Sequence, residues 1–514
     1  MKILLINPPY DSKDDTVINS FFLQPVQNMG LAYIASYLEQ FHHNVDVMEC
    51  PPLKLKWVDI SKQMKNNEYD LVGISVYSYN FKMTTLIGNR IKKMFPKTKL
   101  VLGGFLATLF VNEMFNNILH LDYCVLHEGE QVLHELITAL ENEFTTLEHI
   151  KGIAFKNKDG KIIVTKKQQI NQSLDELPFP KMSYLSPNGM AAIISGRGCH
   201  GQCHYCAVAN YISHAEGKYC RKRKPELVTD EILHLIKSYG IKFLTFHDDS
   251  FFTSATKSWI EQWVESMRNS SVHIPFNLFA RSDDVIFYQD QIPLMKEIGL
   301  TLIFIGVESF VPRQLKLYKK GISSEDNIRA VKILKENKVN YSLGLMLLDP
   351  FVNIDEIRHN LSVLVELEYV QQRFVDIPPV SLLSPVYSVK GSKFEEMLAT
   401  NDFLNNTELG YDFQDPMVRL FYNIQEKWTN SVWPLNRSLE AYGIAYSQGD
   451  MDLAEHLLDA KIALRNTDIL FTLALCDYVE MKTRESLTVF LRPWLSQLEI
   501  IQYTIDRTIK GCVV

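Results

Sequence analysis

Short apolar runs alternate with amphipathic stretches along the first 145 residues of the chain. One of these runs, 44–48, alternates apolar and polar residues in the manner of a strand. The stretches between the runs carry apolar residues at helical spacing. We therefore expect an open, doubly wound α/β sheet. The expected strands are 2–7, 44–48, 70–75, 99–102 and 123–126, and the expected helices are 30–40, 82–94 and 130–140.

The alternation stops at residues 146–188. Two short β-type runs, 150–155 and 161–165, flank Asp159-Gly160, a dipeptide that favours a hairpin turn. Pro178 and Pro180 follow and resist helix formation. The pattern predicts a linker that contains a β-hairpin.

A second α/β alternation covers residues 189–385, and residues 386–514 are patterned as helices. In the second alternation, polar residues stand where the expected strands 243–247, 274–280 and 301–306 stop. Strand ends of this kind hold the sites of parallel α/β sheets and barrels. In the C-terminal region the apolar spacing predicts three helices, over 451–464, 468–481 and 487–509.

Candidate site residues follow from these strand ends. In the first sheet they include a glycine pair that permits close approach of a bulky ligand. In the second alternation they are mostly charged. The candidates are Ser75, Gly103, Gly104 and Glu128 in the first sheet, and Asp248, Asp249, Arg281 and Glu308 in the second.

Three cysteines carry the most specific chemistry. Cys199, Cys203 and Cys206 are spaced Cys-x3-Cys-x2-Cys just after an apolar run, and Tyr205 precedes the last of them. Three thiolates at this spacing can hold three irons of a [4Fe–4S] cluster and leave the fourth iron open. The alternative is a structural zinc site, but zinc takes four ligands and usually two separated cysteine pairs. The sequence has no second pair near this motif.

Composition narrows the class of protein. The chain has 514 residues, of which 46% are hydrophobic and 22% charged, with a formal net charge of −7. These values are typical of a globular protein of several domains and provide no general electrostatic case for nucleic-acid binding. No run of about 18 apolar residues predicts a membrane span, and no signal peptide is recognisable. Eight cysteines suit a reducing compartment, so we expect a cytoplasmic protein. From the net charge and the lack of an apolar span we expect neither nucleic-acid nor membrane partners.

The cysteine motif, together with the upstream domain, resembles the cobalamin-dependent radical S-adenosylmethionine (SAM) enzyme family. The resemblance implies an N-terminal Rossmann-like cobalamin-binding domain, a partial (β/α)6 TIM-like barrel as radical SAM core, and a helical C-terminal domain. The implied boundaries are 1–145, a linker over 146–188, 189–385 and 386–514. The upstream phrases that carry the resemblance are Lys2–Pro9, Gly30–Ala35, Val72–Ser75, Leu102–Gly104 and Glu128–Glu130.

The resemblance also implies roles for the candidate residues. Tyr205 would pack near the adenine of SAM, and Asp248 and Asp249 would meet its ammonium group. Glu308 would face the ribose or amino end, and Arg281 would pair with the carboxylate. The first domain lacks the Asp-x-His-x-x-Gly motif that supplies a histidine to cobalt, so its cobalamin is expected to be base-off without a histidine ligand. We expect His42, His43, His120 and His127 to be surface or loop residues. The alternative is a degenerate domain that binds no cofactor.

Three functions remain open from the sequence. In the leading hypothesis the chain is a methyltransferase. A 5′-deoxyadenosyl radical would activate an inert carbon, or a phosphinate, of a secondary-metabolite substrate, which would then accept a methyl group from SAM through methylcobalamin. The second hypothesis is oxidative cyclisation or ring rearrangement with the same cofactors, and the third is a non-catalytic sensor. The first two need a small-molecule or peptide substrate and a reductant such as flavodoxin or ferredoxin.

Overall fold

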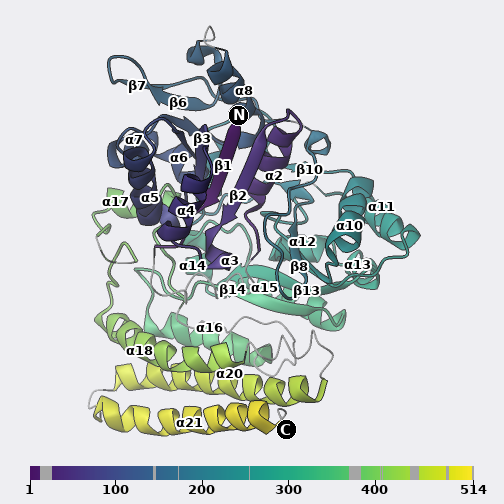
Figure 1. Cartoon of the computed structure of the whole chain (residues 1–514). Helices are drawn as coiled ribbons and strands as arrows, with labels where there is room; N and C mark the ends of the chain where they lie inside the picture. Colours follow the sequence, from purple (N-terminus) through teal and green to yellow (C-terminus); the bar gives the residue numbers. More distant parts are fainter. Residues whose placement is uncertain are drawn as a thin grey trace. The chain divides into compact units, whose positions relative to one another are not determined.

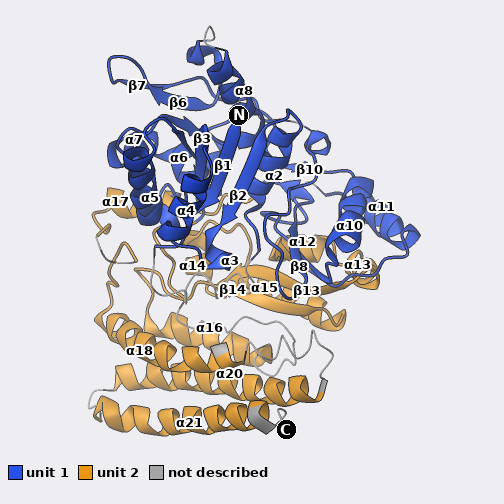
Figure 2. Ribbon diagram, viewed as in Figure 1, with its two compact units in different colours: residues 1–200, 206–276, 389–392 blue, residues 201–205, 277–388, 393–514 orange. Residues whose placement is uncertain are grey.

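The computed structural model describes residues 1–11, 26–142, 146–171, 173–253, 255–369, 384–405, 407, 409–439, 451–481 and 485–511. The chain forms two compact units (Figure 2). Unit 1 contains residues 1–200, 206–276 and 389–392, and unit 2 contains residues 201–205, 277–388 and 393–514.

A seven-stranded sheet forms the first half of unit 1 (Figure 1). Its order is β2-β1-β3-β4-β5-β6-β7, and the first five strands are parallel, as the apolar runs predicted. β1 and β3 are buried over nearly their whole length, because helices cover both faces. The parallel strands are β1 (Lys2–Asn7), β2 (Asn44–Glu49), β3 (Leu71–Ser75), β4 (Lys99–Gly103) and β5 (Tyr123–Val125).

The two faces of this sheet carry separate apolar cores. One core includes side chains of α2 (Met29–Glu39) and α8 (Gly129–Glu141), and these two helices contact each other. The other includes side chains of α4 (Trp57–Asn66), α5 (Phe81–Met94) and α7 (Val111–Asn117). The result is a three-layer domain whose ligand edge lies at the carboxyl ends of the parallel strands.

The predicted hairpin is present, but it belongs to the sheet. β6 (Ile153–Lys156) and β7 (Ile162–Val164) pair antiparallel around a turn with Gly160 at φ 78°. β6 also pairs antiparallel with β5. It thereby satisfies the backbone groups that β5 would otherwise leave unpaired at the sheet edge.

The second half of unit 1 begins with two parallel strands, β8 (Met190–Ile193) and β11 (Phe243–Phe246). Between them in the chain lies a short antiparallel pair, β9 (Gly196–Arg197) and β10 (Arg221–Lys222). The remaining helices of this half are α9 (Val208–Ile212), α10 (Pro225–Tyr239) and α11 (Lys257–Asn269), of which α10 and α11 pack together.

Unit 2 continues the strand–helix alternation. β12 (Phe276–Arg281), β13 (Leu300–Glu308) and β14 (Asn340–Leu345) are neighbours in that order, and β13 and β14 are parallel. The helices that follow them are α12 (Ser282–Phe287), α13 (Ile292–Glu297), α14 (Pro312–Leu317), α15 (Ser324–Glu336) and α16 (Ile354–Glu366).

The C-terminal part of unit 2 is helical, as expected, with one difference. Residues 451–464 and 468–481 were expected to form two helices, but α20 (Met451–Glu480) is continuous. The polar residues that interrupt the apolar spacing are accommodated in the bundle; for example, Trp428 donates a 2.7 Å hydrogen bond to Asp468. The other helices are α17 (Lys393–Thr400), α18 (Pro416–Ser438) and α21 (Leu487–Gly511).

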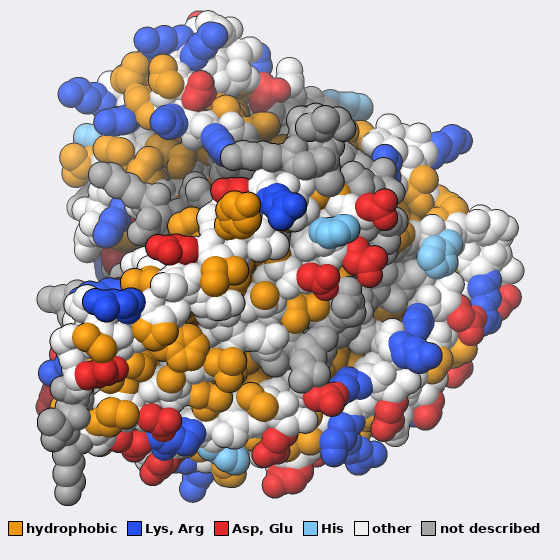
Figure 3. All heavy atoms as spheres, turned by 90° about the horizontal axis from the view of Figure 1, so that it is seen from below, with side chains coloured by type: hydrophobic (Ala, Val, Ile, Leu, Met, Phe, Trp, Pro, Cys, Tyr) orange, Lys and Arg blue, Asp and Glu red, His pale blue; other side chains and the backbone are white. Residues whose placement is uncertain are grey.

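The helix α20 packs against α16, α18 and α21. Seen from the α21 side, hydrophobic and charged side chains are interspersed (Figure 3). Among the helices that the structure describes, none is both long and apolar enough to cross a membrane.

Candidate functional site

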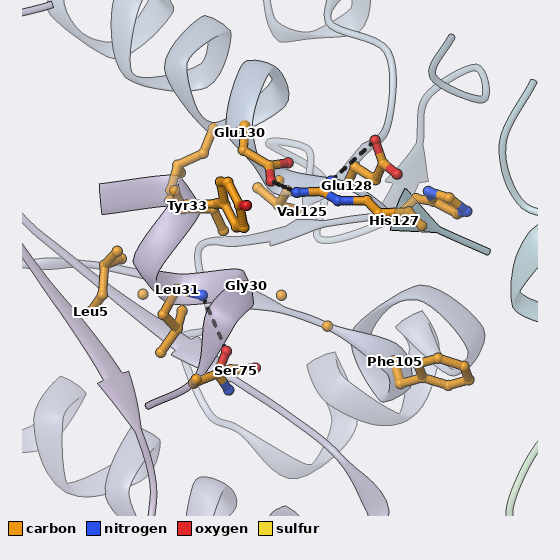
Figure 4. Close-up of a pocket in the computed structure, with 18 of the residues that line it drawn as sticks. Leu5, Gly30, Leu31, Tyr33, Ser75, Phe105, Val125, His127, Glu128 and Glu130 are labelled. Atoms are coloured by element: carbon orange, nitrogen blue, oxygen red, sulfur yellow. Dashed lines mark hydrogen bonds and ion pairs between the residues drawn. The ribbon is translucent and has the colours of Figure 1, made fainter. Parts of the chain in front are cut away.

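A cavity of about 270 Å³ lies at the carboxyl ends of the parallel strands of unit 1 (Figure 4). The four residues that the sequence placed at this edge, Ser75, Gly103, Gly104 and Glu128, all line it. Side chains from the second half of the unit, such as Arg197, complete the lining. The empty space around it, including the part open to solvent, is about 1220 Å³. The strand ends thus form a concave site, as expected for a doubly wound sheet.

The two glycines of the predicted pair serve different purposes. Gly104 has φ +95°, and a Cβ there would lie 3.1 Å from the carbonyl oxygen of Val76. Gly103 has no such backbone constraint, and the nearest atom to a Cβ there would be the carbonyl oxygen of Val125 at 3.8 Å. The backbone conformation at Gly104 therefore requires a glycine, whereas the lack of a side chain at Gly103 leaves space in the cavity.

Two carboxylates of the cavity are paired with arginines. Glu128 accepts hydrogen bonds from Arg221, and its Oε2 lies 3.4 Å from Nη1 of Arg197. Arg197 also donates to Glu130. Burial opposes the ionisation of Glu128, but the two arginines outweigh burial and lower its pKa. Charged groups from both halves of unit 1 are thus held together at the cavity.

Aromatic rings form another part of the lining. Phe105 and Tyr211 are stacked with centroids 4.3 Å apart, and His127 stacks on Tyr211 at 4.2 Å. His127 lies in the loop between β5 and α8, as one of the two expected settings, but its side chain is buried in the cavity lining rather than exposed at the surface (Figure 4). His43 is also buried, near the N-terminal amino group, whereas His42 and His120 are exposed.

The three motif cysteines lie in one loop of the chain, in which Cys199 and Cys206 are half-buried and Cys203 is buried. None of the three forms a disulfide. Three thiols within eight residues are a donor set that fits three irons of a cluster.

In unit 2, Lys320 contacts three of the predicted residues, Tyr205, Glu308 and Arg281. Tyr205 donates a 2.8 Å hydrogen bond to Oε1 of Glu308, and Nζ of Lys320 lies 2.8 Å from the same oxygen. Arg281 donates to the carbonyl oxygen of Lys320 at 2.8 Å and to Sγ of Cys203 at 3.7 Å. Asp283 accepts from the guanidinium of Arg281 at 3.0 and 3.2 Å.

Burial and charge act on this cluster together. Burial, and then the charges of Glu308 and Cys203, raise the pKa of Tyr205 well above its ordinary value. Burial lowers the pKa of Lys320, but Glu308 and Cys203 outweigh it, so the pKa is raised and the ammonium is retained. Glu308 is 8% exposed and adopts φ 60° at an irregularity in the pairing of β13 with β14. An acid held in such a conformation is typical of a functional site.

Asp248 and Asp249 lie in unit 1 and have different partners. Asp248 accepts from the backbone and hydroxyl of Ser195 and from Nζ of Lys222 at 2.9 Å. Asp249 lines the cavity and accepts a 3.0 Å hydrogen bond from the amide of Gly198, while burial raises its pKa. Asp249 is therefore part of the cavity lining, whereas Asp248 is engaged by Ser195 and Lys222.

The basic run around Arg221 has buried partners. Arg221 pairs with Glu128, Lys222 with Asp248 and Arg223 with Glu231. A run of consecutive basic residues is typical of a solvated loop, and two of the carboxylates that pair with this one, Glu128 and Asp248, are distant in the chain. The same reason hides Lys320, Arg197 and Glu130, whose roles depend on side chains far away in sequence.

The loop glycines also acquire a reason from the structure. A Cβ at Gly196 would lie 2.7 Å from the carbonyl oxygen of Arg221, and one at Gly198 would lie 2.7 Å from the ring of Tyr219. These glycines admit the segment 219–221 against the cysteine loop, a use that spacing alone did not reveal.

Comparison with known proteins explains this combination of sites. Residues 16–137 match the family model of the B12 binding domain, and residues 193–364 match that of the radical SAM superfamily. The chain belongs to the cobalamin-dependent radical SAM family. The cavity of unit 1 lies in its B12-binding part and draws on its radical SAM part, and the cysteine motif lies at the start of the radical SAM match.

Known relatives of this family member are diverse. An uncharacterized methyltransferase of Pyrococcus horikoshii is 27% identical over 436 residues, which are 83% of this chain and 90% of that protein. The anaerobic magnesium-protoporphyrin IX monomethyl ester cyclase of Rubrivivax gelatinosus is 25% identical over 353 residues, 66% of this chain and 61% of the cyclase.

A solved structure shares the fold over almost the whole chain. It is that of the cobalamin-dependent SAM radical enzyme OxsB with aqua-cobalamin and SAM bound. It matches with a TM-score of 0.75 and 17% identity, covering 99% of this chain and 80% of OxsB.

Proposed function

We propose that this radical SAM enzyme is a methyltransferase. It moves a methyl group from SAM, by way of cobalamin, to an unactivated carbon or a phosphinate of a secondary-metabolite substrate. The observation that carries the proposal is the presence, in one chain, of a cavity in a B12-binding domain and a three-cysteine motif in a radical SAM domain. Methyl transfer is favoured because the relative from Pyrococcus horikoshii, which covers most of the chain, is described as a methyltransferase.

The cysteine loop provides the iron ligands in this proposal. Cys199, Cys203 and Cys206 hold three irons and leave the fourth for SAM. When bound, the cluster supplies the electron that generates the 5′-deoxyadenosyl radical from SAM. Arg281 supports Cys203, because its guanidinium donates to the sulfur and is itself oriented by Asp283. Glu308 and Tyr205 are the residues of unit 2 proposed to contact SAM.

Cobalamin is proposed to bind base-off in the cavity of unit 1, without a histidine ligand to cobalt. The residues present fit such a cofactor: Gly103 keeps space open, and Ser75 and the Glu130–Arg197 pair offer hydrogen-bonding groups for an amide-rich ligand. The sequence has no Asp-x-His-x-x-Gly motif, and this supports cobalamin binding without a histidine ligand to cobalt.

A second candidate is oxidative cyclisation or ring rearrangement with the same cofactors. The similarity to the cyclase of Rubrivivax gelatinosus favours it. Both reactions require a small-molecule or peptide substrate, and an electron donor such as flavodoxin or ferredoxin. Both also require a reducing compartment such as the cytoplasm, because the motif cysteines must remain thiols.

One experiment separates these functions without knowledge of the substrate. The full chain is purified anaerobically with iron and hydroxocobalamin, reduced, and given SAM with a trideuterated methyl group. Mass spectrometry then follows 5′-deoxyadenosine and the label on cobalamin. The methyltransferase proposal predicts both products in the wild type and in Cys220→Ala, a matched cysteine outside the motif, and no 5′-deoxyadenosine from Cys203→Ala.

The other outcomes are equally decisive. Formation of 5′-deoxyadenosine with no label on cobalamin would support the cyclase or rearrangement reading instead. Protein that holds iron and cobalamin but yields neither product would overturn both enzymatic proposals.

A further inference from the structure

One polar side chain in the cavity of unit 1 has no polar partner. His127 is 4% exposed, and neither Nδ1 nor Nε2 has a hydrogen-bond partner among the described residues. By contrast, Glu128, Glu130 and Arg197 in the same lining are all paired. A buried polar group without a partner costs free energy, so its retention calls for an explanation.

The backbone holds His127 in an uncommon conformation. Its φ is 68°, in the left-handed region, and its amide donates a 2.8 Å hydrogen bond to Oγ1 of Thr108. Histidine tolerates this region better than most residues, but the conformation still has a cost and persists where the surroundings enforce it. The backbone conformation and the hydrogen bond to Thr108 therefore fix the position of the imidazole in the cavity lining.

The ring itself is held by aromatic neighbours. It stacks on Tyr211 with an interplanar angle of 10° and meets Tyr219 edge-on at 5.7 Å. Burial lowers the pKa of His127 to about 4; Glu128 opposes this shift, and Arg221 contributes to it. At neutral pH the imidazole is uncharged, so it presents one N–H donor and one nitrogen acceptor.

We propose that His127 binds an amide side chain at the edge of the corrin ring. One ring nitrogen donates to the oxygen of this amide, and the other nitrogen, which points away from it, can accept from the NH2 of a second corrin amide. This inference rests on the proposed function, because it takes cobalamin as the ligand of the cavity. A neutral donor–acceptor pair complements an amide, whereas a carboxylate or phosphate would be better matched by two donors or a cation.

Cobalt ligation is the competing role for this imidazole. A metal-bound histidine almost always donates its second ring N–H to a carboxylate, a carbonyl or water, which fixes the tautomer and the ring orientation. Neither nitrogen of His127 has such a hydrogen bond to the part of the chain that the structure describes, and the ring is oriented by stacking instead. The geometry therefore favours an amide contact over coordination.

The test compares cobalamin affinity between matched histidines. His127→Phe keeps the stacked ring and removes both nitrogens. His134→Phe is the control, because His134 is also stacked, on Phe41 at 3.7 Å, and also has a nitrogen without a partner, but it does not line the cavity. We expect His127→Phe to raise the Kd of hydroxocobalamin roughly 10- to 100-fold, as the loss of one or two buried hydrogen bonds would. His134→Phe should leave the Kd unchanged.

Two further measurements separate a binding role from a structural one. The thermal midpoint of the cofactor-free protein should fall only slightly in His127→Phe. A small fall is expected because phenylalanine adopts the left-handed backbone conformation less readily than histidine. His127→Gly suits that backbone and carries the affinity test if the phenylalanine variant does not fold. Labelling histidine with 15N should leave the electron paramagnetic resonance spectrum of bound cob(II)alamin unchanged.

The outcomes distinguish the two levels of the proposal. A wild-type protein that binds no cobalamin overturns the proposed function. Wild-type binding with an equal Kd in both His127 variants overturns this inference alone. A change of hyperfine splitting with 15N-histidine that disappears in His127→Phe would make His127 a cobalt ligand and would also overturn the amide contact.

Discussion

Tyr205 and Glu308 are 103 positions apart in the chain and are joined by a 2.8 Å hydrogen bond from the phenol to the carboxylate. Lys320 binds the same carboxylate oxygen. The arrangement places a tyrosine next to the last motif cysteine, an acid at the end of β13 and a buried lysine in one cluster. The tyrosine and the acid were expected near SAM from the sequence. The ammonium group of Lys320 balances the negative charge of Glu308.

The first prediction concerns the stability of this cluster. Lys320→Met leaves the carboxylate of Glu308 buried without its cation, which typically costs about 3–5 kcal/mol. We expect the denaturation midpoint of the variant to fall markedly in urea. Lys319→Met is the control, because Lys319 is its exposed neighbour, and this variant should unfold like the wild type. Equal midpoints for the two variants would show that the Lys320–Glu308 pair contributes little.

The second prediction concerns SAM. Glu308→Gln keeps an acceptor for Tyr205 but removes the negative charge from the proposed SAM contact. Because one charged hydrogen bond contributes about 1.5–3 kcal/mol, we expect the Kd of SAM to rise at least tenfold. Isothermal titration of cluster-loaded protein measures it, with the exposed Glu336→Gln as control. An unchanged Kd would restrict Glu308 to the structural pair with Lys320.

The third prediction uses the glycine pair of the cavity. Gly104→Ala should destabilise the fold by more than about 1 kcal/mol, because the backbone has φ +95° and the new Cβ would press against Val76. Gly103→Ala should fold normally, since no atom would lie within 3.4 Å of its Cβ, yet it should retain less cobalamin. Melting curves and the absorbance of the purified protein test both effects. Full cobalamin retention by Gly103→Ala would place the cofactor elsewhere.

The fourth prediction concerns pH. Burial raises the pKa of Asp468 to about 7, against the lowering effect of its hydrogen bond from Trp428. For an acid whose pKa is raised on folding, the stabilising contribution is complete below the unfolded pKa and is lost as the pH rises through about 7.

Asp468→Asn should therefore stabilise the protein at pH 8, on the order of 2 kcal/mol, while having little effect near pH 4. Denaturation curves across this range measure the difference. Asp452→Asn, an exposed change in the same helix, is the control and should follow the wild type at every pH. A parallel pH dependence for Asp468→Asn and the wild type would show that Asp468 is ionised in the folded state.

Sequence patterns predicted the elements well where a local rule applied. The apolar runs located β1 to β5, and the Asp159-Gly160 dipeptide located the hairpin, because strand burial and turn conformation depend on adjacent residues. The patterns were wrong where distant contacts compensate for a local break. The polar residues near Asp468 suggested a gap between two helices, but Trp428 from α18 satisfies one of them and the helix continues.

The site shows the same division. The cysteine spacing and the positions of Ser75, Gly103, Gly104 and Glu128 at strand ends were readable from the chain alone, because the spacing of ligands and the direction of parallel strands are local properties. The burial of His127 and the pairing of the basic run 221–223 were not, because each depends on side chains that only folding brings near. The amino-acid sequence by itself thus determined the family, the spacing of the proposed iron ligands and the edge of the sheet that forms the cavity. Tertiary packing alone decided which charges are neutralised and which polar groups remain available to a ligand, since burial and partners are properties of the folded molecule.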